Sequence, residues 1–298
     1  MGRVLITGAS GLLGRALMQE FQGATGWEVL GLAYSRAGGR LKKVDLRDQA
    51  AVRETVQEFK PDILIHSAAQ RRPDVVEKDE EATSALNVEA TRTVAQAAVD
   101  VGAFLVYIST DYVFDGKSPP HKVTDAPNPL NKYGASKLAG EKTALEVAKD
   151  GAVLRVPILY GPIEAIDESA VTVLFGAVQN SGQAAKMSDY ERRYPTHVGD
   201  VAAVCRQLAE KRLQDPSLHG VFHWSGDEEM TKYTMAVAMA EVFSLPSSHL
   251  VADKEPSGGA PRPYNAYLDV SRLRDLGIGK TRPFRESIKE VLQPFLKK

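Results

Sequence analysis

The amino-acid sequence predicts an α/β protein, in which a doubly wound parallel sheet carries helices on both faces and is followed by a smaller C-terminal lobe. Three observations predict this fold class. Short aliphatic runs alternate with stretches of helical spacing, a glycine-rich turn joins the first run to the first helix, and the periodicity loosens after residues 158–161. We therefore expect a first domain over 1–160 and a smaller lobe over 161–298, with a segment at about 195–225 returning to the first domain.

The predicted strands of the first domain are short runs rich in β-branched and aliphatic side chains. They are RVLITGA (3–9), WEVLGLAY (27–34), LKKVDL (41–46), PDILIHSAA (61–69) and AFLVYIST (103–110). Stretches with apolar residues at helical spacing lie between them, at 12–21, 48–59 and 80–102. Because parallel strands need a crossover connection, this alternation is typical of a sheet whose helices cover both faces.

Three glycines mark the turn between the first strand and the first helix. Gly8, Gly11 and Gly14 lie in GASGLLG, which follows the strand and opens the helix. Glycine permits a tight turn and lets a pyrophosphate approach the backbone, while the helix N-terminus offers unpaired N–H groups and a positive dipole end. This context predicts a dinucleotide-binding domain of the Rossmann type.

The end of the second strand bears on which dinucleotide is bound. NAD-binding folds usually carry Asp or Glu there for the ribose, but this sequence has Ser35 and Arg36 in AYSRAGGR. An arginine can pair with a 2′-phosphate through its fork of donors, so we predict NADP(H) as cofactor, with a solvated loop arginine as the alternative. Further residues that the ends of the third and fourth strands bring near the cofactor are Asp45, Leu46, Ala68 and Ala69.

A tyrosine and a lysine share one face of the next predicted helix. NKYGASKLAGEK (131–142) has Tyr133 four residues before Lys137, and the preceding strand ends in Ser109 and Thr110. A nearby ammonium favours the phenolate, so such a tyrosine can donate a proton to a carbonyl oxygen as hydride reaches its carbon. Thr110, or Ser109, would hydrogen-bond the same oxygen, and Lys137 would hold the nicotinamide ribose. An exposed helical pair without chemistry is the alternative.

Fewer helices and strands can be predicted in the second half of the chain. Helices are expected at 169–180 and within 192–211, and a short strand at 220–226. Asp200 suits a helix N-terminus because an acid complements the dipole there, and Thr231 suits an N-cap.

Residues 257–273, SGGAPRPYNAYLDVSRL, predict a loop over the site. Three arginines of the second half could serve an anionic ligand there, and solvated or structural roles are the alternative for each: Arg192, Arg193 and Arg262.

The composition argues against several classes of protein. A formal net charge of −1 over 298 residues gives no sign of a nucleic-acid or membrane binder. Cys205 is the one cysteine and is expected to be a half-buried structural thiol. The six histidines lack metal-ligand spacing, so no metal site is predicted, and His66 is expected to be structural. No run approaches ~18 apolar residues and no signal peptide precedes the first strand, so we expect a cytoplasmic protein, with a nuclear presence also compatible.

The motifs TGASGLLG, NVEAT, YISTDYVFDG and YGASK together resemble the extended short-chain dehydrogenase/reductase superfamily. STDYVFDG is particularly similar to the dTDP-4-dehydrorhamnose reductases, which reduce a 4-keto sugar nucleotide with a nicotinamide cofactor. This resemblance implies a Rossmann domain with a smaller substrate lobe, and Thr110, Tyr133 and Lys137 as the catalytic set of an active enzyme.

A further resemblance covers nearly the whole chain. AAQRRPDVVE, AVLRVPILYG, ESAVTVLF, RRYPTHVGDVAAVCRQLAEKRLQDPS, FHWSGDEEMTKY and LGIGKTRPFRESIKE look like the family of regulatory β subunits of methionine adenosyltransferase II. The resemblance implies NADP(H) binding and association with the catalytic α subunit that makes S-adenosylmethionine. It implies cofactor contacts at Ser10, Gly11, Leu12, Leu13, Tyr34, Ser35, Arg36, Asp45, Leu46, Arg71, Tyr133, Lys137 and Leu159.

Two departures from the regulatory family keep a second hypothesis open. Thr110 stands where that family commonly has serine, and the chain ends at PFLKK, whereas the family usually continues into a tail thought to dock into the catalytic subunit. The first hypothesis is a regulatory subunit of methionine adenosyltransferase. The alternative is an active NADPH-dependent reductase of a 4-keto nucleotide sugar, because one fold can serve both.

Overall fold

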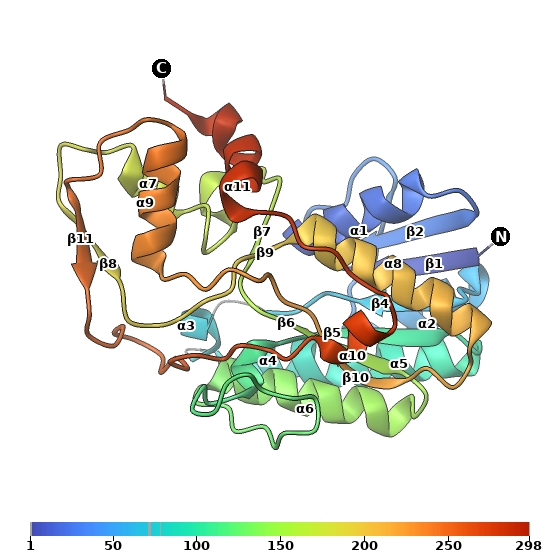
Figure 1. The fold of residues 1–298 in the computed structure, drawn as a ribbon. Helices are drawn as coiled ribbons and strands as arrows, with labels where there is room; N and C mark the ends of the chain where they lie inside the picture. Colours follow the sequence, from blue (N-terminus) through green and yellow to red (C-terminus); the bar gives the residue numbers. More distant parts are fainter. Residues whose placement is uncertain (1, 71–72, 78, 298) are drawn as a thin grey trace.

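The computed structural model describes residues 2–70, 73–77 and 79–297, and its centre is a parallel sheet (Figure 1). The strands of this sheet are β1 (Gly2–Thr7), β2 (Trp27–Ala33), β3 (Leu41–Lys43), β4 (Ile63–His66), β5 (Phe104–Thr110), β6 (Ala152–Val156) and β10 (Gly220–His223). They lie in the order β10-β6-β5-β4-β1-β2-β3, and each neighbouring pair is parallel. The predicted fold class is confirmed.

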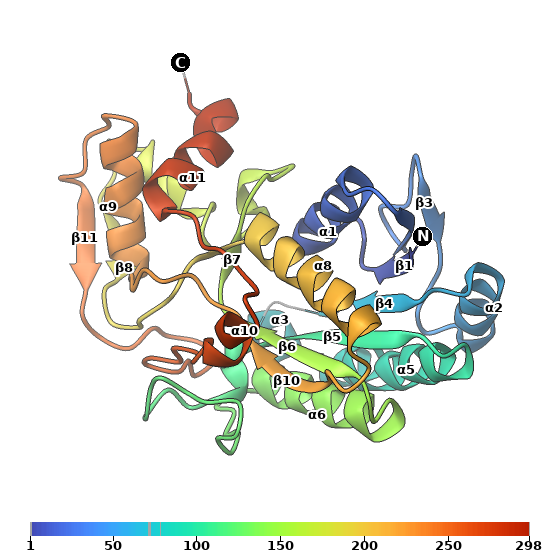
Figure 2. The same ribbon diagram turned by 45° about the vertical axis from the view of Figure 1, so that its right-hand side comes forward.

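Helices cover both faces of the sheet, as Figures 1 and 2 show. Val4 and Ile6 of β1 face one core and Leu5 faces the other, because successive residues of a strand point to opposite sides. The helices over the first core are α1 (Leu12–Gly23) and α8 (Val198–Gln214), and those over the second are α2 (Gln49–Phe59), α5 (Ala90–Asp100) and α6 (Lys132–Val147).

Part of the second half lies on the large sheet. Helix α8 packs along α1, and β10 pairs with β6 from Gly220 opposite Ala152 to His223 opposite Arg155. Cys205 of α8 is buried in the core beneath, where burial raises the pKa of its thiol to about 12. This thiol therefore packs as an apolar side chain.

The rest of the second half forms a smaller lobe with its own core. Its helices and strands are β8 (Ala185–Ser188), α7 (Leu174–Val178), α9 (Lys232–Val242), β11 (Leu250–Asp253) and α11 (Phe284–Leu292). Phe175, Met235, Met239 and Ile288 are among the buried side chains that unite them. Thr231 caps α9 as expected, since its hydroxyl accepts from Thr234 N at 3.1 Å.

The remaining elements are short. They are α3 (Pro73–Val76), α4 (Glu80–Ser84), a π-helical turn (Ala85–Glu89), 3₁₀ turns (Asp111–Val113, Ile166–Glu168 and Gln293–Phe295), β7 (Leu159–Tyr160), β9 (Thr196–His197) and α10 (Ser271–Asp275). Strands β7 and β9 pair with each other between the sheet and the lobe, and β8 pairs with β11. None of the helices in the described ranges is long and apolar enough to cross a lipid bilayer.

Two predicted helices differ from the structure. The stretch predicted as one helix at 80–102 is helical over 80–100 but contains a π-helical turn, from which Asn87 bonds Gln70 and Ser136. The stretch predicted at 169–180 is helical only in α7, because the Ser169 hydroxyl accepts from Val171 N at 3.0 Å and holds a turn there.

Two glycines let helix α6 pack closely against the turn that follows β5, against the Tyr107 side chain and against the π-helical turn. A Cβ on Gly134 would lie 2.2 Å from the Tyr112 carbonyl oxygen, and a Cβ on Gly140 would lie 2.2 Å from the Tyr107 hydroxyl. The Asn131 side chain caps the helix by accepting from Gly134 N at 2.8 Å. A side chain at either glycine would therefore push the helix away from the sheet.

Helix α6 is also joined to β6 by a buried ion pair. Arg155 donates to Glu141 at 2.9 and 2.7 Å, and both side chains are about 4% exposed. Two hydrogen bonds in parallel offset part of the cost of removing these charges from water, and losing either partner would strand the other.

Gly140→Ala should destabilise the protein by about 1–3 kcal/mol, because overpacking against Tyr107 outweighs the better helix propensity of alanine. The matched control is Gly176→Ala in α7, where an added Cβ meets no atom within 4 Å. That control should be neutral or slightly stabilising. Urea unfolding measures both, and equal stability of the two variants would contradict the close approach.

Candidate functional site

The candidate site lies at the carboxyl ends of β1, β2, β4 and β5, where the glycine turn and the first turns of α6 meet the sheet edge. Ligands of open parallel sheets bind at this edge. Gly8 has φ +66°, and a Cβ on Gly14 would lie 2.1 Å from the Gly8 carbonyl oxygen. Helix α1 begins at Leu12 with Gly11 as its N-cap, so its first N–H groups point into the turn.

The glycine turn also approaches the end of β4. A Cβ on Gly8 would lie 2.9 Å from the Ala68 backbone, and Ala68 N donates to the Thr7 hydroxyl at 3.3 Å. Ala68 and Ala69 are half-buried beside the turn. Arg71, predicted to follow them, lies outside the described residues.

The end of β2 carries exposed side chains, as the sequence analysis expected. Tyr34, Ser35 and Arg36 are all exposed. The Tyr34 ring has the Arg47 guanidinium 5.5 Å from its centre. Arg36 donates to Glu164 at 2.6 Å, so this arginine is an ion-pair partner and not simply a solvated loop residue.

Asp45 and Leu46 follow β3 but differ in their surroundings. Asp45 accepts hydrogen bonds from Arg47 at 2.9 and 2.7 Å, and these lower the pKa of its carboxyl. Leu46 is buried in the core, so only its backbone faces this edge of the sheet.

His66 at the end of β4 is held inside the core. Its ring lies 2.7 Å from the Thr7 hydroxyl and 3.1 Å from the Thr91 hydroxyl. Burial and then the charge of Lys137 lower the pKa of His66 to about 3, so it stays neutral. Both ring nitrogens of His66 therefore make structural hydrogen bonds inside the core.

Lys137 is the most unusual ionisable group at the site. It is 4% exposed, donates to the Ile108 carbonyl oxygen at 2.7 Å, and lies 4.1 Å from the centre of the Tyr107 ring. Burial lowers the pKa of Lys137 to about 7, partly opposed by the charge of Glu141. The pair on α6 is thus not an exposed helical pair.

Thr110 and Tyr133 stand at the same end of β5. The Thr110 hydroxyl donates to Asp111 at 3.0 Å and accepts from Tyr112 N at 3.2 Å. The rings of Tyr112 and Tyr133 meet edge to face at 5.8 Å. Ser109 is buried, and its hydroxyl finds no hydrogen-bond partner among the described residues.

Asp111 is a buried carboxyl that the sequence analysis did not assign. Burial raises the pKa of Asp111 to about 6, against the opposing effects of Arg193 and of the Thr110 hydroxyl. Its position in the motif STDYVFDG was the feature of the sequence that could have pointed to it as a site residue. Asn87 was likewise missed, although NVEAT contains it, because only the π-helical turn directs it toward Gln70.

The three candidate arginines of the second half fall into different surroundings. Arg193 is buried, donates to the Pro263 carbonyl oxygen at 3.1 Å and lies over the Tyr112 ring. Arg262 is tied to Asp74 at 3.2 Å and to nearby carbonyl groups, so its role is structural. Arg192 is half-buried beside Tyr264.

Basic charge gathers near Arg193. Burial, followed by the charges of Arg262 and Arg193, lowers the pKa of Lys232. An anionic group next to the sheet edge would be favoured by this charge.

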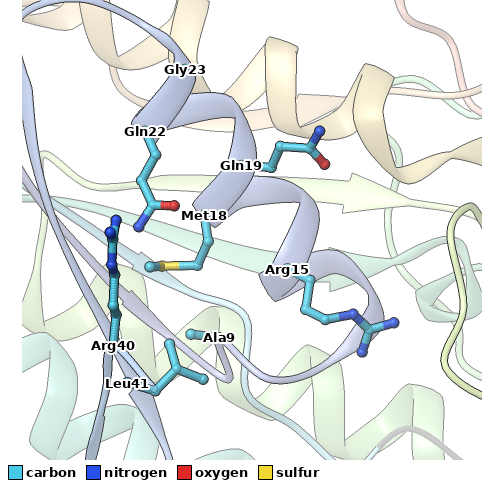
Figure 3. A pocket seen from close by; sticks show the side chains of 8 residues that line it. All are labelled: Ala9, Arg15, Met18, Gln19, Gln22, Gly23, Arg40 and Leu41. Carbon is cyan, nitrogen blue, oxygen red and sulfur yellow. The ribbon is translucent and has the colours of Figure 1, made fainter. Parts of the chain in front are cut away.

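A shallow depression of about 460 Å³ lies beside the glycine turn, between α1 and the start of β3. Figure 3 shows Met18, Ala9 and Leu41 close together there, with Arg40 near Gln22 and the Arg15 side chain directed away. This depression is separate from the Tyr133 and Lys137 side of the edge. Within the described part of the chain, no three His, Cys, Asp or Glu residues gather as metal ligands would.

Leu159 in β7 is half-buried, and its carbonyl oxygen accepts from the Ser169 hydroxyl at 2.8 Å. The edge as a whole combines a helix N-terminus for phosphate, a cation after β2, and a hydroxyl, a phenol and a buried amine around β5. This arrangement is able to hold a dinucleotide and to donate a proton to a carbonyl.

Comparison with known proteins agrees with this geometry. The family described as RmlD substrate binding domain matches residues 2–297. The protein named methionine adenosyltransferase 2 subunit beta is 55% identical in Xenopus tropicalis over 296 residues, covering 99% of this chain and 88% of that one. The Bos taurus protein of the same name has the same identity and coverage.

A solved structure of similar shape is the dTDP-4-dehydrorhamnose reductase of Bacillus anthracis in complex with NADP. It has a TM-score of 0.85, 28% identity, and covers 98% of each chain. Both resemblances expected from the sequence are therefore confirmed. The chain belongs to the RmlD substrate binding domain family and, within it, to the family of methionine adenosyltransferase 2 beta subunits.

Proposed function

We propose that this protein is an NADP(H)-binding regulatory subunit that associates with a catalytic methionine adenosyltransferase subunit and tunes the synthesis of S-adenosylmethionine. The observation that carries this proposal is the 55% identity over 99% of the chain to proteins named as subunits of that enzyme. The partner is inferred from those names. In a regulatory subunit the bound cofactor can stabilise the folded protein without any reduction of a substrate.

The cofactor part of the proposal rests on the shape of the sheet edge. The pyrophosphate would lie on the backbone of Ser10, Gly11, Leu12 and Leu13 at the N-terminus of α1. Gly8 and Gly14 let this turn pack against Ala68 and against the start of the helix. The nicotinamide end would lie beside Tyr133, Lys137 and Leu159. When bound, the cofactor can supply a hydride or accept one.

The adenosine end supports NADP(H) over NAD(H). Arg36 is exposed at the end of β2, Ser35 offers a hydroxyl, and no acid stands in that strand end. Tyr34 presents its ring, and the backbone at Asp45 and Leu46 would border the adenine. Arg71, Ala68 and Ala69 would complete the contacts.

A second function is favoured by one observation, the complete hydroxyl, phenol and amine set of Thr110, Tyr133 and Lys137. In a reductase of a 4-keto nucleotide sugar, Tyr133 would donate its proton to the carbonyl oxygen, and Thr110 would hydrogen-bond that oxygen. The charge around Arg193 and Lys232 would suit a nucleotide diphosphate. The regulatory function remains the stronger proposal, because the relatives at 55% identity carry the subunit name, whereas the dTDP-4-dehydrorhamnose reductases compared reach 30%.

The test of the regulatory function is a mixing experiment. The protein is combined with a catalytic methionine adenosyltransferase subunit, with and without NADP, and followed by size-exclusion chromatography and by the rate of S-adenosylmethionine formation. We expect a shared peak and altered kinetics. Separate elution at micromolar concentrations, with unchanged kinetics, would contradict the proposal, and the catalytic subunit alone is the control.

Tyr133→Phe separates the two functions. In the regulatory protein it should weaken NADPH binding about two- to fivefold, the cost of one hydrogen bond, and leave association with the catalytic subunit intact. In a reductase it should lower turnover of dTDP-4-dehydrorhamnose by a factor of about 10² or more. Binding is measured by calorimetry and turnover by NADPH oxidation, and a variant that turns over as fast as the parent would exclude Tyr133 as the acid.

Lys137 predicts a pH dependence of stability. With the pKa of Lys137 at about 7 in the folded protein and ~10.4 in the unfolded chain, only the unfolded chain holds this proton between those values. Raising the pH through this window therefore favours folding, by at most about 1.4 kcal/mol per pH unit, and well below pH 7 the effect is constant.

The Lys137→Met variant should lose this contribution. Its stability relative to the parent should fall steadily from pH 7 to 9.5 in urea unfolding, while Lys142→Met, an exposed position on the same helix, should show a constant difference. A flat difference for Lys137→Met would mean that the buried amine stays charged.

A further inference from the structure

Two arginines and two glutamates form a cluster beside the glycine turn. Arg15 lies on α1 and Arg36 follows β2, while Glu164 and Glu168 lie on the segment after β7. Arg36 Nη1 is 2.6 Å from Glu164 Oε2, and Arg15 Nη1 is 3.5 Å from the same oxygen. We call these four residues the arginine–glutamate cluster. It joins the end of β2 to residues 128 positions later in the chain.

One pair of the cluster is a fixed anchor. Arg15 donates to both carboxylate oxygens of Glu168 at 2.7 Å, and to the Ser10 carbonyl oxygen at 2.9 Å. The Glu168 side chain is 7% exposed and also accepts from Glu164 N at 2.9 Å. Burial alone would raise the pKa of Glu168, but the hydrogen bond and charge of Arg15 lower it to about 2. This anchor holds the segment in place.

The other pair is exchangeable. The side chains of Arg36 and Glu164 are 50% and 57% exposed, and one hydrogen bond joins them. Exposed pairs of this kind contribute little and are screened by salt. A phosphate offers more charge and more acceptor oxygens to the same guanidinium, so it would compete with Glu164 for Arg36.

We propose that Glu164 is a specificity-determining residue for the adenosine end of the cofactor, because its carboxylate holds the Arg36 guanidinium that a 2′-phosphate would bind. Glu164 thereby weakens binding of NADP(H) relative to NAD(H). This inference rests on the proposed binding of NADP(H) at this edge. In this proposal Arg36 creates the preference for NADP(H) over NAD(H), and Glu164 reduces that preference.

The direction of the effect follows from charge. Folds that bind NAD place a carboxylate at the end of the second strand, where it accepts from a ribose hydroxyl and repels a phosphate. The end of β2 has no such acid in the sequence, but the fold brings Glu164 to Arg36 at that place. Both effects, competition for Arg36 and repulsion of the phosphate, act against NADP(H) and neither acts against NAD(H).

The effect should stay local because the hydrogen bonds of the anchor do not use the Glu164 side chain. Glu168 keeps its two hydrogen bonds to Arg15 when the Glu164 side chain changes, and the Glu164 backbone N–H still donates to Glu168. A Glu164→Gln variant should therefore fold like the parent. The matched control is Glu241→Gln, which removes an equally exposed partner of Arg285 in the smaller lobe.

Calorimetric titration of the full chain with NADPH and with NADH tests the inference. Glu164→Gln should bind NADPH about three- to fivefold more tightly, leave NADH binding unchanged or weaker, and show a smaller effect at high salt. Glu241→Gln should match the parent for both. In the Arg36→Gln background, which should bind NADPH more weakly than the parent, adding Glu164→Gln should raise NADPH affinity by a smaller factor than in the parent, because only the repulsion of the phosphate remains to be relieved.

The outcomes separate the inference from the function on which it rests. A parent protein that binds neither NADPH nor NADH would overturn the proposed cofactor site and the role of Glu164 with it. A parent that binds NADPH, with a Glu164→Gln variant of unchanged affinity, would overturn the role of Glu164 alone. Equal tightening for NADPH and NADH would also overturn it, since that result would show a general charge effect without specificity.

Discussion

The close packing of α6 against β5 is the constraint on which the site depends. Gly134 lets the helix pack against the Tyr112 carbonyl group just after β5, and Gly140 lets it pack against the Tyr107 hydroxyl of that strand. The buried pair of Arg155 and Glu141 fixes the helix to the neighbouring strand. At that separation Lys137 reaches the Ile108 carbonyl oxygen inside the protein. The lowered pKa of Lys137 is thus a consequence of helix packing and not of a neighbouring charge, because burial is its dominant cause.

Contacts between the two halves complete the site from the other side. Arg15 binds Glu168 and Asp74 binds Arg262, so the segments after β7 and before α10 are tied to the sheet edge. The large sheet also takes its last strand from the second half. A ligand at the carboxyl ends of the strands would therefore touch residues from distant parts of the chain, and the two halves would respond to it together.

One architecture can serve regulation or catalysis, because the features that hold a dinucleotide are also those that position a proton donor. The glycine turn, Arg36 and Lys137 would serve cofactor binding under either proposal. Only the use of Tyr133 and Thr110 differs, and a regulatory subunit can keep both for cofactor contact and stability. This explains how a chain that belongs with methionine adenosyltransferase beta subunits shares its fold with a reductase at a TM-score of 0.85.

The sequence by itself determined the parallel α/β fold, the glycine turn and the pairing of Tyr133 with Lys137, because periodicity and short spacing are local properties that survive without tertiary contacts. Only the tertiary structure decided the π-helical turn that directs Asn87, the burial of Lys137 and Asp111, and the meeting of Arg36 with Glu164. These features depend on contacts between segments that are as many as 128 residues apart in the sequence. A local sequence pattern does not indicate which distant side chains will be in contact in the folded protein.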